Sequence, residues 1–442
     1  MKKNNIRYLI LLVLPIIFIF TFILLTKDSQ SNLTLNIKSK IPKNVRMLLK
    51  DSINFYLNNF GVKFKKINPR NVISSQGSSL IVNEFKNNLL DYQGPRSYFD
   101  LDEKNIFLIS GTGIIFKTEI NNITNLNNEI IFDAIDTNIK SLINYKDFYR
   151  NSNYGVKGFK IIDGYFYVSF SNFVEEDCIN ISVIKGKIIN KKIDFKYLFN
   201  PGECIKKKNS YREFQPIQSG GAIYDFDEES FIMSTGEFRF RDLAQDKNSL
   251  YGKILRINKE HGSTKIISMG HRNVQGLYYD KNKKIIVSTE HGPMGGDEIN
   301  INKKINDIIN FGWPISSYGE HYPKMAPKDA YEKAPLLKSH DDYGFQEPIK
   351  YFVPSIGITQ IVKARSENDD ESFFYGSMGY ADREKSHSIH KITFNSLYDK
   401  IEFEDQIKLN ARVRDLKYIN SRNLLFAYLE KKGSIILINF NE

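Results

Sequence analysis

The chain has 442 residues, with 62 Lys and Arg against 51 Asp and Glu and a formal net charge of +11. Its 41% hydrophobic and 26% charged residues exclude a disordered, collagen-like or coiled-coil protein. The charge is confined to one end: residues 1–90 contain 14 Lys or Arg and 3 Asp or Glu, whereas residues 91–442 are neutral overall. A nucleic-acid-binding protein normally carries its basic patch on the folded domain, so the sequence argues against a nucleic-acid partner.

The first element is an uncharged run over residues 8–26, which follows Lys2, Lys3 and Arg7. Its 19 residues are just long enough to cross a bilayer core of about 30 Å. A cleaved signal peptide would have a shorter apolar run and a small-residue cleavage site, which the end of this run lacks. We therefore expect residues 1–30 to be an uncleaved signal-anchor, single-pass in the inner membrane, with the rest of the chain in the periplasm.

Residues 31–90 differ in composition from the rest of the chain. The apolar residues that follow Pro42 recur at helical spacing, namely Val45, Leu48, Leu49, Ile53, Leu57 and Phe60. The pattern predicts one amphipathic helix within a basic linker close to the membrane, where anionic headgroups would attract it. A solvated connector is the alternative.

From residue 91 onwards the sequence contains an internal repeat. In each copy, a turn rich in Asp, Asn or Gly precedes a short apolar strand that ends at Ser or Gly. The copies lie at 100–113, 161–172, 225–237, 280–292, 368–379 and 419–430. Radial repetition of four-stranded units is typical of a β-propeller, and the alternating helices of a parallel α/β fold are missing. We predict an all-β, six-bladed β-propeller over residues 91–442, with residues 300–350 as a long loop.

The two cysteines, Cys178 and Cys204, lie 26 residues apart. An exported protein favours a disulfide between them, and two buried thiols are the alternative. No Cys/His cluster in the sequence has the spacing of a zinc site.

Three segments carry polar chemistry beyond that of an ordinary strand ending. They are HRNVQGL (271–277), EHGPMGGDEIN (290–300) and NFGWP (310–314). Glycine turns allow carbonyls to point inward, and carbonyls with carboxylates are the ligands that Ca²⁺ prefers. A turn that satisfies only its own polar groups is the alternative for each segment, but three such segments together favour a site.

These motifs, with NFGWPISSYG (310–319) and AQDKNSLYGKILRIN (244–258), resemble the glucose/sorbosone dehydrogenase family from about residue 95 to the C-terminus. The resemblance implies a six-bladed propeller like that of the soluble aldose sugar dehydrogenases. It also implies pyrroloquinoline quinone and Ca²⁺ as cofactors, and a small sugar as substrate. It does not extend to the anchor or the basic linker.

The resemblance assigns quinone contacts to one turn and one pair of arginines. Arg272, Asn273 and Gln275 match the family's quinone-contacting turn. Arg412 and Arg414 match paired arginines that engage the cofactor's carboxylates, a role that suits bidentate guanidinium groups.

The resemblance also assigns the metal and two further cofactor contacts. The carbonyls of Gly292 and Pro293 would hold Ca²⁺, with Asp297 supporting their loop. Phe352 falls where an aromatic side chain stacks on the quinone, and Met378 falls where the family has a lysine.

One departure concerns the catalytic base, which is a histidine in the family. Gln218 falls at that position, and glutamine cannot accept a proton near neutral pH. General-base assistance is worth about 10²–10⁴ in rate. The first histidine of the chain is His261, so no shift in register restores the base. His291 is usual in the family's loop, where it is not the base.

The sequence therefore supports two functions of different classes. The first is a membrane-anchored periplasmic oxidoreductase that transfers a hydride from C1 of an aldose to the quinone, with Gln218 and Arg272 at the catalytic position. The second is a catalytically inactive propeller that binds carbohydrate or protein. An enzyme of altered chemistry in the same pocket is a third possibility, and the dehydrogenase agrees best with the resemblance.

Overall fold

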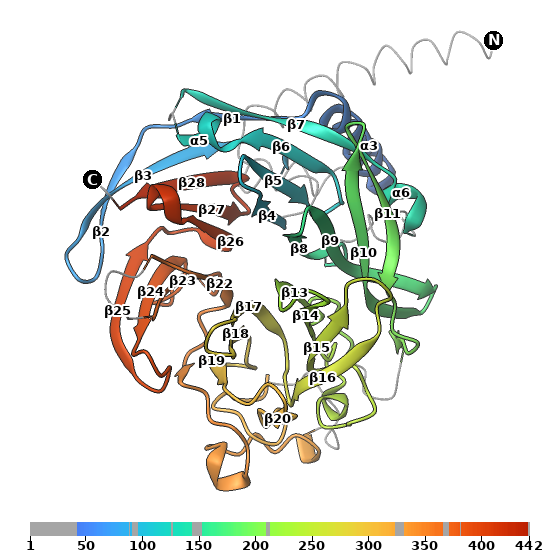
Figure 1. Ribbon diagram of the computed structural model, residues 1–442, viewed down its shortest axis with the longest axis vertical. Helices are drawn as coiled ribbons and strands as arrows, with labels where there is room; N and C mark the ends of the chain where they lie inside the picture. The colour runs from blue at the N-terminus through green and yellow to red at the C-terminus, as the bar shows by residue number, and fades with distance from the viewer. Residues whose placement is uncertain are drawn as a thin grey trace.

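In the computed structural model, antiparallel β-sheets are arranged in a ring around a central axis (Figure 1). The structure describes residues 42–87, 89–90, 96–124, 127–143, 153–208, 213–322, 331–365, 371–380 and 382–440. The predicted membrane anchor, residues 8–26, lies outside these ranges. Within them, no helix has both the length and the apolar character needed to cross a membrane.

Each repeat of the sequence forms one antiparallel sheet built from successive hairpins. The turns follow from their Asp residues: Asp102 Oδ1 accepts the backbone N–H groups of Lys104 and Asn105 at 2.8 and 2.7 Å. The repeat copies fall on the second strand of each sheet, which is β5 (Asn105–Ser110), β9 (Tyr165–Glu175), β14 (Ser230–Thr235), β18 (Ile285–Glu290), β23 (Glu371–Ser377) or β27 (Leu424–Glu430). The predicted repeat is therefore a structural repeat.

The innermost strands contact one another in a closed cycle around the axis. In cyclic order they are β4 (Ser97–Leu101), β8 (Val156–Ile162), β13 (Gly220–Asp225), β17 (Val274–Asp280), β22 (Ile358–Lys363) and β26 (Arg412–Ile419). Because every innermost strand borders the axis, its ends and adjoining loops meet at the mouth of the ring.

The remaining strands complete the sheets towards the outside. They are β6 (Ile115–Glu119), β7 (Glu129–Thr137), β10 (Cys178–Ile189), β11 (Lys192–Phe199), β12 (Ile205–Lys206), β15 (Lys253–Asn258), β16 (Thr264–Met269), β19 (Asp297–Asn302), β20 (Ile309–Asn310), β21 (Lys350–Phe352), β24 (Ser388–Phe394), β25 (Ile401–Lys408) and β28 (Ser434–Asn439). The apolar clusters of the core lie between neighbouring sheets, where each sheet covers the face of the next. Between β19 and β21, the described residues 303–322 and 331–349 contain only short elements, as expected for the predicted long loop.

The N-terminal segment closes the ring, which corrects the predicted domain boundary at residue 91. β3 (Ser79–Lys86) pairs with β28 as the outer strand of the last sheet. β1 (Val62–Lys66) pairs with both β3 and β7 and so bridges the last sheet to the first, while β2 (Arg70–Ile73) flanks β3. Residues 62–86 are therefore part of the propeller sheets and not of a linker.

The predicted amphipathic helix is present as α3 (Lys43–Phe60). Its inward residues Leu49, Ile53 and Leu57 join the core beside β7, whereas Leu48 and Phe60 are exposed. The helix thus packs on the ring instead of lying in a separate connector. Two short helices accompany the first two sheets: α5 (Ile120–Thr124) contacts β6 and β7, and α6 (Ile139–Leu142) contacts β11.

Cys178 and Cys204 are joined by a disulfide, with their Cα atoms 5.5 Å apart. This separation lies in the usual range for a disulfide. The bond connects the start of β10 to the segment beside β12, which pairs with β10. It therefore ties a loop of the second sheet to that sheet's own strand.

Substitutions in β3 test the closure of the ring. Phe85 is fully buried, whereas Ile81 on the same strand is 42% exposed. We expect Phe85→Ala to lower the free energy of unfolding by about 3–5 kcal/mol, because it leaves a cavity in the apolar cluster that β3 shares with β1, β7 and α3. Ile81→Ala, the matched control, should change it by less than about 0.5 kcal/mol. Denaturant unfolding measures both, and equal effects would mean that β3 does not close the ring.

Candidate functional site

A pocket of about 470 Å³ lies at the mouth of the ring. Every innermost strand contributes to it, either directly or through the loop at its end. Most of the residues named from the sequence line it, namely Gln218, Arg272, Asn273, Gln275, Gly292, Pro293, Asp297, Met378, Arg412 and Arg414. The ring thus brings together residues that are nearly 200 positions apart in the sequence.

The lining of this mouth pocket is strongly cationic. Its eight Lys and Arg residues are Arg96, Lys157, Arg239, Arg272, Arg383, Arg412, Arg414 and Lys431. Its carboxylates are Asp297 and Glu430. Positive charge in a concave site of low dielectric concentrates anions, so the pocket suits a ligand with several carboxylates or phosphates.

Glu430 holds the paired arginines in place. Arg412 Nε and Nη2 each lie 3.1 Å from Glu430 Oε1, and Arg414 binds Oε2 through both Nε and Nη2. Burial opposes ionisation of Glu430, but Arg414, Arg412 and Arg96 outweigh it and hold the pKa of Glu430 down at about 2. The carboxylate is therefore charged at neutral pH and fixes two guanidinium groups at the pocket wall.

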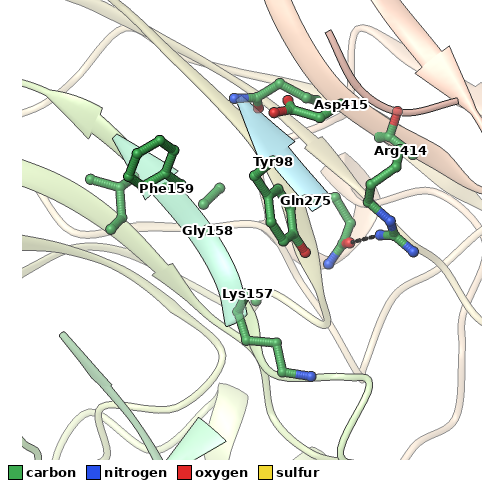
Figure 2. A pocket seen from close by; sticks show the side chains of 12 residues that line it. Tyr98, Lys157, Gly158, Phe159, Gln275, Arg414 and Asp415 are labelled. Atoms are coloured by element: carbon green, nitrogen blue, oxygen red, sulfur yellow. Dashed lines mark hydrogen bonds between the residues drawn. The ribbon is translucent and has the colours of Figure 1, made fainter. Parts of the chain in front are cut away.

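Below the mouth pocket the central channel narrows (Figure 2). Tyr98, Gln275 and Arg414 line it, and Gln275 Oε1 accepts a hydrogen bond from Arg414 Nη1 at 3.5 Å. The space between them is about 20 Å³, which is room for about one water molecule. A ligand the size of a sugar or a quinone therefore fits the mouth pocket but not the channel.

The turn of Arg272 and Asn273 is held by a buried carboxylate from β18. Glu290 Oε1 accepts the backbone N–H of Arg272, and its Oε2 lies 2.9 Å from His271 Nδ1. The Arg272 guanidinium lies over the Trp313 ring at 5.4 Å, and Asn273 Oδ1 accepts the backbone N–H of Gly220 at 3.0 Å. These contacts explain why the HRNVQGL and NFGWP segments occur together.

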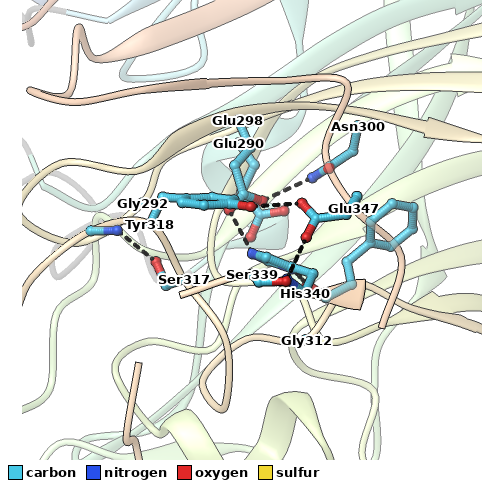
Figure 3. Close-up of polar contacts among 12 residues, drawn as sticks. Glu290, Gly292, Glu298, Asn300, Gly312, Ser317, Tyr318, Ser339, His340 and Glu347 are labelled. Carbon is cyan, nitrogen blue, oxygen red and sulfur yellow. Dashed lines mark hydrogen bonds and ion pairs between the residues drawn. The ribbon is translucent and has the colours of Figure 1, made fainter. Parts of the chain in front are cut away.

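A second polar layer supports the 290–300 loop from outside (Figure 3). Asn300 Nδ2 donates to Glu298 at 3.2 Å, and Glu347 accepts from the Tyr318 hydroxyl at 2.9 Å and the His340 backbone at 2.6 Å. Burial and then the nearby Glu290 raise the pKa of Glu298 well above its usual range. The layer satisfies polar groups that lie behind the pocket wall.

The oxygens proposed to bind Ca²⁺ already have hydrogen-bond donors. Asp297 Oδ1 accepts from Gly292 N at 3.1 Å, and its Oδ2 accepts from Gly357 N and Ile358 N at 2.6 and 3.0 Å. The Gly292 carbonyl accepts from Arg272 Nη1 at 2.5 Å.

The Pro293 carbonyl accepts from the hydroxyls of Tyr322 and Ser355 at 3.2 and 3.4 Å. The Arg272 guanidinium therefore already occupies the Gly292 carbonyl, and both oxygens of Asp297 already accept backbone N–H groups. No group of three or more His, Cys, Asp or Glu suited to a metal occurs in the described part of the chain. This arrangement does not fit Ca²⁺.

Gln218 lies at the pocket wall with its amide in a charged environment. Oriented to suit its neighbours, the amide nitrogen donates to Glu237 at 2.9 Å, and the oxygen accepts from Arg272 and Arg239 at 2.8 and 3.0 Å. Burial raises the pKa of Glu237 to about 8 despite the nearby arginines. The amide links this carboxyl group to the Arg272 side chain, and an amide has no basic lone pair.

The prediction for Phe352 was wrong. Its ring is buried in the core between β19 and β23 and does not line the mouth pocket. The residue supports the neighbouring loop instead, because its carbonyl accepts from Gly296 N at 2.8 Å and β21 pairs with β19 at Asp297. Met378 does line the pocket, and its carbonyl accepts from Arg412 Nη1.

Several lining residues escaped the sequence analysis, most importantly Arg96, Lys157, Arg239 and Glu430. Arg96 precedes β4, and Lys157 is the bulge residue of β8, which is the place that Arg414 takes in β26. Aligning the repeats on their innermost strands would have identified the first two. Glu430 is the last residue of the second strand β27, and Arg239 follows the second strand β14.

Three comparisons place the chain among known proteins. The family profile described as "Glucose / Sorbosone dehydrogenase" matches residues 162–437. An uncharacterized protein of Synechocystis is 31% identical over 198 residues, covering 41% of this chain and 43% of the relative. The aldose sugar dehydrogenase YliI of Escherichia coli is 28% identical over 210 residues, covering 44% and 52%. The matches thus span about half the length of these curated relatives.

Solved structures show the same fold at low sequence identity. A glucose dehydrogenase has a TM-score of 0.60 at 18% identity and covers 78% of this chain and 96% of its own. The apo aldose sugar dehydrogenase of Escherichia coli scores 0.57 at 20%, covering 78% and 94%. The quinone-bound aldose sugar dehydrogenase of Streptomyces coelicolor scores 0.54 at 18%, covering 77% and 92%. The fold is therefore of the glucose dehydrogenase propeller type.

The hydrogen bonds at Gly292, Pro293 and Asp297 predict that Ca²⁺ does not stabilise the quinone-free protein. A ligand raises the melting temperature only when it binds the folded state. We expect the melting temperature to be the same with millimolar Ca²⁺ and with a chelator, as measured by differential scanning fluorimetry. An increase with Ca²⁺ that Asp297→Asn abolishes would show that Arg272 yields its place to the cation.

Proposed function

The chain belongs to the glucose/sorbosone dehydrogenase family, and on this premise we propose that the mouth pocket binds pyrroloquinoline quinone and that the protein oxidises an aldose at C1. One observation carries the proposal: the pocket has eight Lys and Arg residues against two carboxylates, and the quinone is a polycarboxylate. When bound, the quinone would supply a two-electron acceptor for the hydride from the sugar.

The residues of the pocket divide this work. Arg412 and Arg414, held by Glu430, would bind carboxylates of the quinone through bidentate contacts. Arg272 and Asn273 present further donors from the turn before β17. Because these groups are fixed by buried partners, little conformational entropy is lost when the ligand binds. No step of this proposal passes through Ca²⁺.

We further propose that the ring consists of six blades. The closed cycle of innermost strands supports this count, since each such strand begins one antiparallel sheet. In this arrangement β3 supplies the outer strand of the sixth blade. An experimental structure with a different number of sheets around the axis would contradict the count.

The cellular location is also a proposal, in which residues 8–26 anchor the chain in the inner membrane and the ring lies in the periplasm. The uncharged run at residues 8–26 supports the anchor. The Cys178–Cys204 disulfide agrees with an oxidising compartment.

A second candidate function is ligand binding without a redox step. The observation that favours it is Gln218, whose amide takes the place that the resemblance assigns to a catalytic histidine and hydrogen-bonds to Glu237 and Arg272. A pocket that binds the quinone or an anionic saccharide without turnover would fulfil this alternative.

Quinone titration of the full-length protein, followed by absorbance, tests the proposed function. We expect saturable binding that Arg412→Gln weakens roughly 10- to 100-fold, because hydrogen bonds to charged groups contribute about 1.5–3 kcal/mol. Arg256→Gln is the control, since Arg256 pairs with Asp227 at 2.6 Å and does not line the pocket.

The titration is combined with an activity assay that contains an aldose and an added electron acceptor, and together they separate the candidates. Reduction of an added electron acceptor in the presence of an aldose supports the dehydrogenase, and quinone binding without turnover supports the binding protein. No quinone binding, or equal binding by wild type and Arg412→Gln, would contradict the proposed site.

Fractionation of cells tests the location. We expect the full-length chain in the membrane fraction and a variant without residues 1–30, exported by a cleavable signal peptide, in the soluble periplasmic fraction. The anchored protein should show no reactive thiol when it is denatured without reductant. Two reactive thiols, or a soluble full-length chain, would contradict the proposed location.

A further inference from the structure

One lysine of the mouth pocket has an environment unlike that of the other cations. Lys157 is the second residue of β8 and is 7% exposed. Its Nζ donates to the carbonyls of Asn153 at 2.6 Å and Pro216 at 3.0 Å. Lys157 and Tyr98 line the same narrow space, and in Figure 2 the Lys157 side chain extends away from the Tyr98 ring.

No carboxylate accompanies this buried amine. Among the described residues, Lys157 makes no ion pair, and both of its hydrogen-bond acceptors are neutral carbonyls. Burial and the positive charges of Arg96 and Arg414 hold the pKa of Lys157 well below its usual range. Burial also raises the pKa of the adjacent Tyr98, which stays neutral.

The hydrogen-bond inventory agrees with a neutral amine. A neutral Nζ has two N–H bonds, which match the Asn153 and Pro216 carbonyls, and one lone pair. A charged ammonium would leave its third N–H without a protein acceptor in a nearly fully buried position, at considerable cost. In the neutral state, Nζ of this pocket-lining residue keeps one lone pair beyond these two hydrogen bonds.

The two carboxylates of the lining are engaged, and burial lowers the pKa of His291, which also lines the pocket. Both oxygens of Asp297 accept backbone N–H groups, and both oxygens of Glu430 bind arginines. His291 Nε2 lies 2.6 Å from the Ile358 carbonyl, so it carries the proton. Its Nδ1 faces the Asn273 amide at 3.5 Å.

Lys157 also lies next to the segment of Gln218. The Pro216 carbonyl that it contacts is two residues before Gln218, and both side chains line the same pocket. Gly221 has φ +111°, and a Cβ there would come within 2.4 Å of Lys157 Cβ. The absence of a side chain at Gly221 thus allows β13 to pack directly against the start of β8.

We propose that Nζ of Lys157 is the proton acceptor of this site, in place of the imidazole that Gln218 does not supply. The inference rests on the proposed function. In the reaction, the O–H bond at C1 of the aldose breaks and its proton forms a bond to Nζ. The C1–H bond breaks as the hydride leaves to the oxidant, a bound ortho-quinone, and C1 becomes the carbonyl carbon of a lactone. The ammonium then returns its proton to solvent.

Competitive acetylation of the quinone-free, full-length protein measures the protonation of the Lys157 amine independently of any cofactor. Trace acetic anhydride is applied between pH 6 and 10, and each lysine peptide is quantified by mass spectrometry. The midpoint of reactivity reports the pKa, whereas burial changes only the overall rate.

We expect the midpoint of Lys157 to lie below that of Lys160, which is on the same strand and pairs with Asp100 at 3.2 Å. The charged groups that act on Lys157 are Arg96, which precedes β4, and Arg414 of β26, and Tyr98 of β4 lines the same channel. An equal or higher midpoint, or no labelling of Lys157 up to pH 10, would overturn the proposal.

Kinetics with added quinone provide the second readout. Lys157→Met should lower kcat by about 10²–10⁴-fold while leaving quinone affinity within a few-fold of wild type, because a neutral amine contributes little to anion binding. Lys160→Met, the matched control, should retain the wild-type rate. Undiminished turnover by Lys157→Met would overturn the proposal. A low midpoint for Lys157 together with no quinone binding would instead refute the proposed function.

Discussion

The site depends on the buried contact between Glu430 and the guanidinium groups of Arg412 and Arg414. Cations brought together at the mouth of a propeller repel one another, and burial makes each of them costly. One carboxylate that stays ionised, with its pKa at about 2, offsets part of this cost and fixes both arginines. A net positive charge nevertheless remains in the pocket, so a polyanion is the ligand that completes its electrostatics.

The ring makes this contact possible, because it brings the start of β26 and the end of β27 to the same mouth as the turns before β13 and β17. The rigidity of a ring of sheets depends on the strand pairing that joins its last sheet to its first. Here β3 and β1 join the last sheet to the first, so a segment far from the chemistry in sequence maintains the geometry of the pocket.

Much of this could be predicted from the sequence. The repeat located the second strand of every sheet, and helical spacing located α3, because both patterns arise from local periodicity. The strands over residues 62–86 were assigned to a linker, because lysines alternate with the buried residues Val62 and Phe64 in β1 and give the segment a basic composition. Pairing with β28 is a long-range contact that no local pattern records.

The residues of the site divide in the same way, into those that local motifs reveal and those that only long-range contacts reveal. Arg272, Asn273, Arg412 and Arg414 were found through motifs, whereas Arg96 and Lys157 stand in ordinary strand sequences and become site residues only through the ring. Phe352 was misplaced because β21 turns its ring into the core. The Gly292–Asp297 loop has the composition of a Ca²⁺ site, but its oxygens are taken by Arg272 and by backbone amides, which only the three-dimensional contacts reveal.

A crystal structure of the full-length protein soaked with pyrroloquinoline quinone would test the central claim most directly. The account predicts the quinone in the mouth pocket, with carboxylates hydrogen-bonded to Arg412 and Arg414 and with Glu430 still bound to both arginines. A quinone bound elsewhere on the protein, or a mouth pocket that remains empty at saturating quinone, would contradict it.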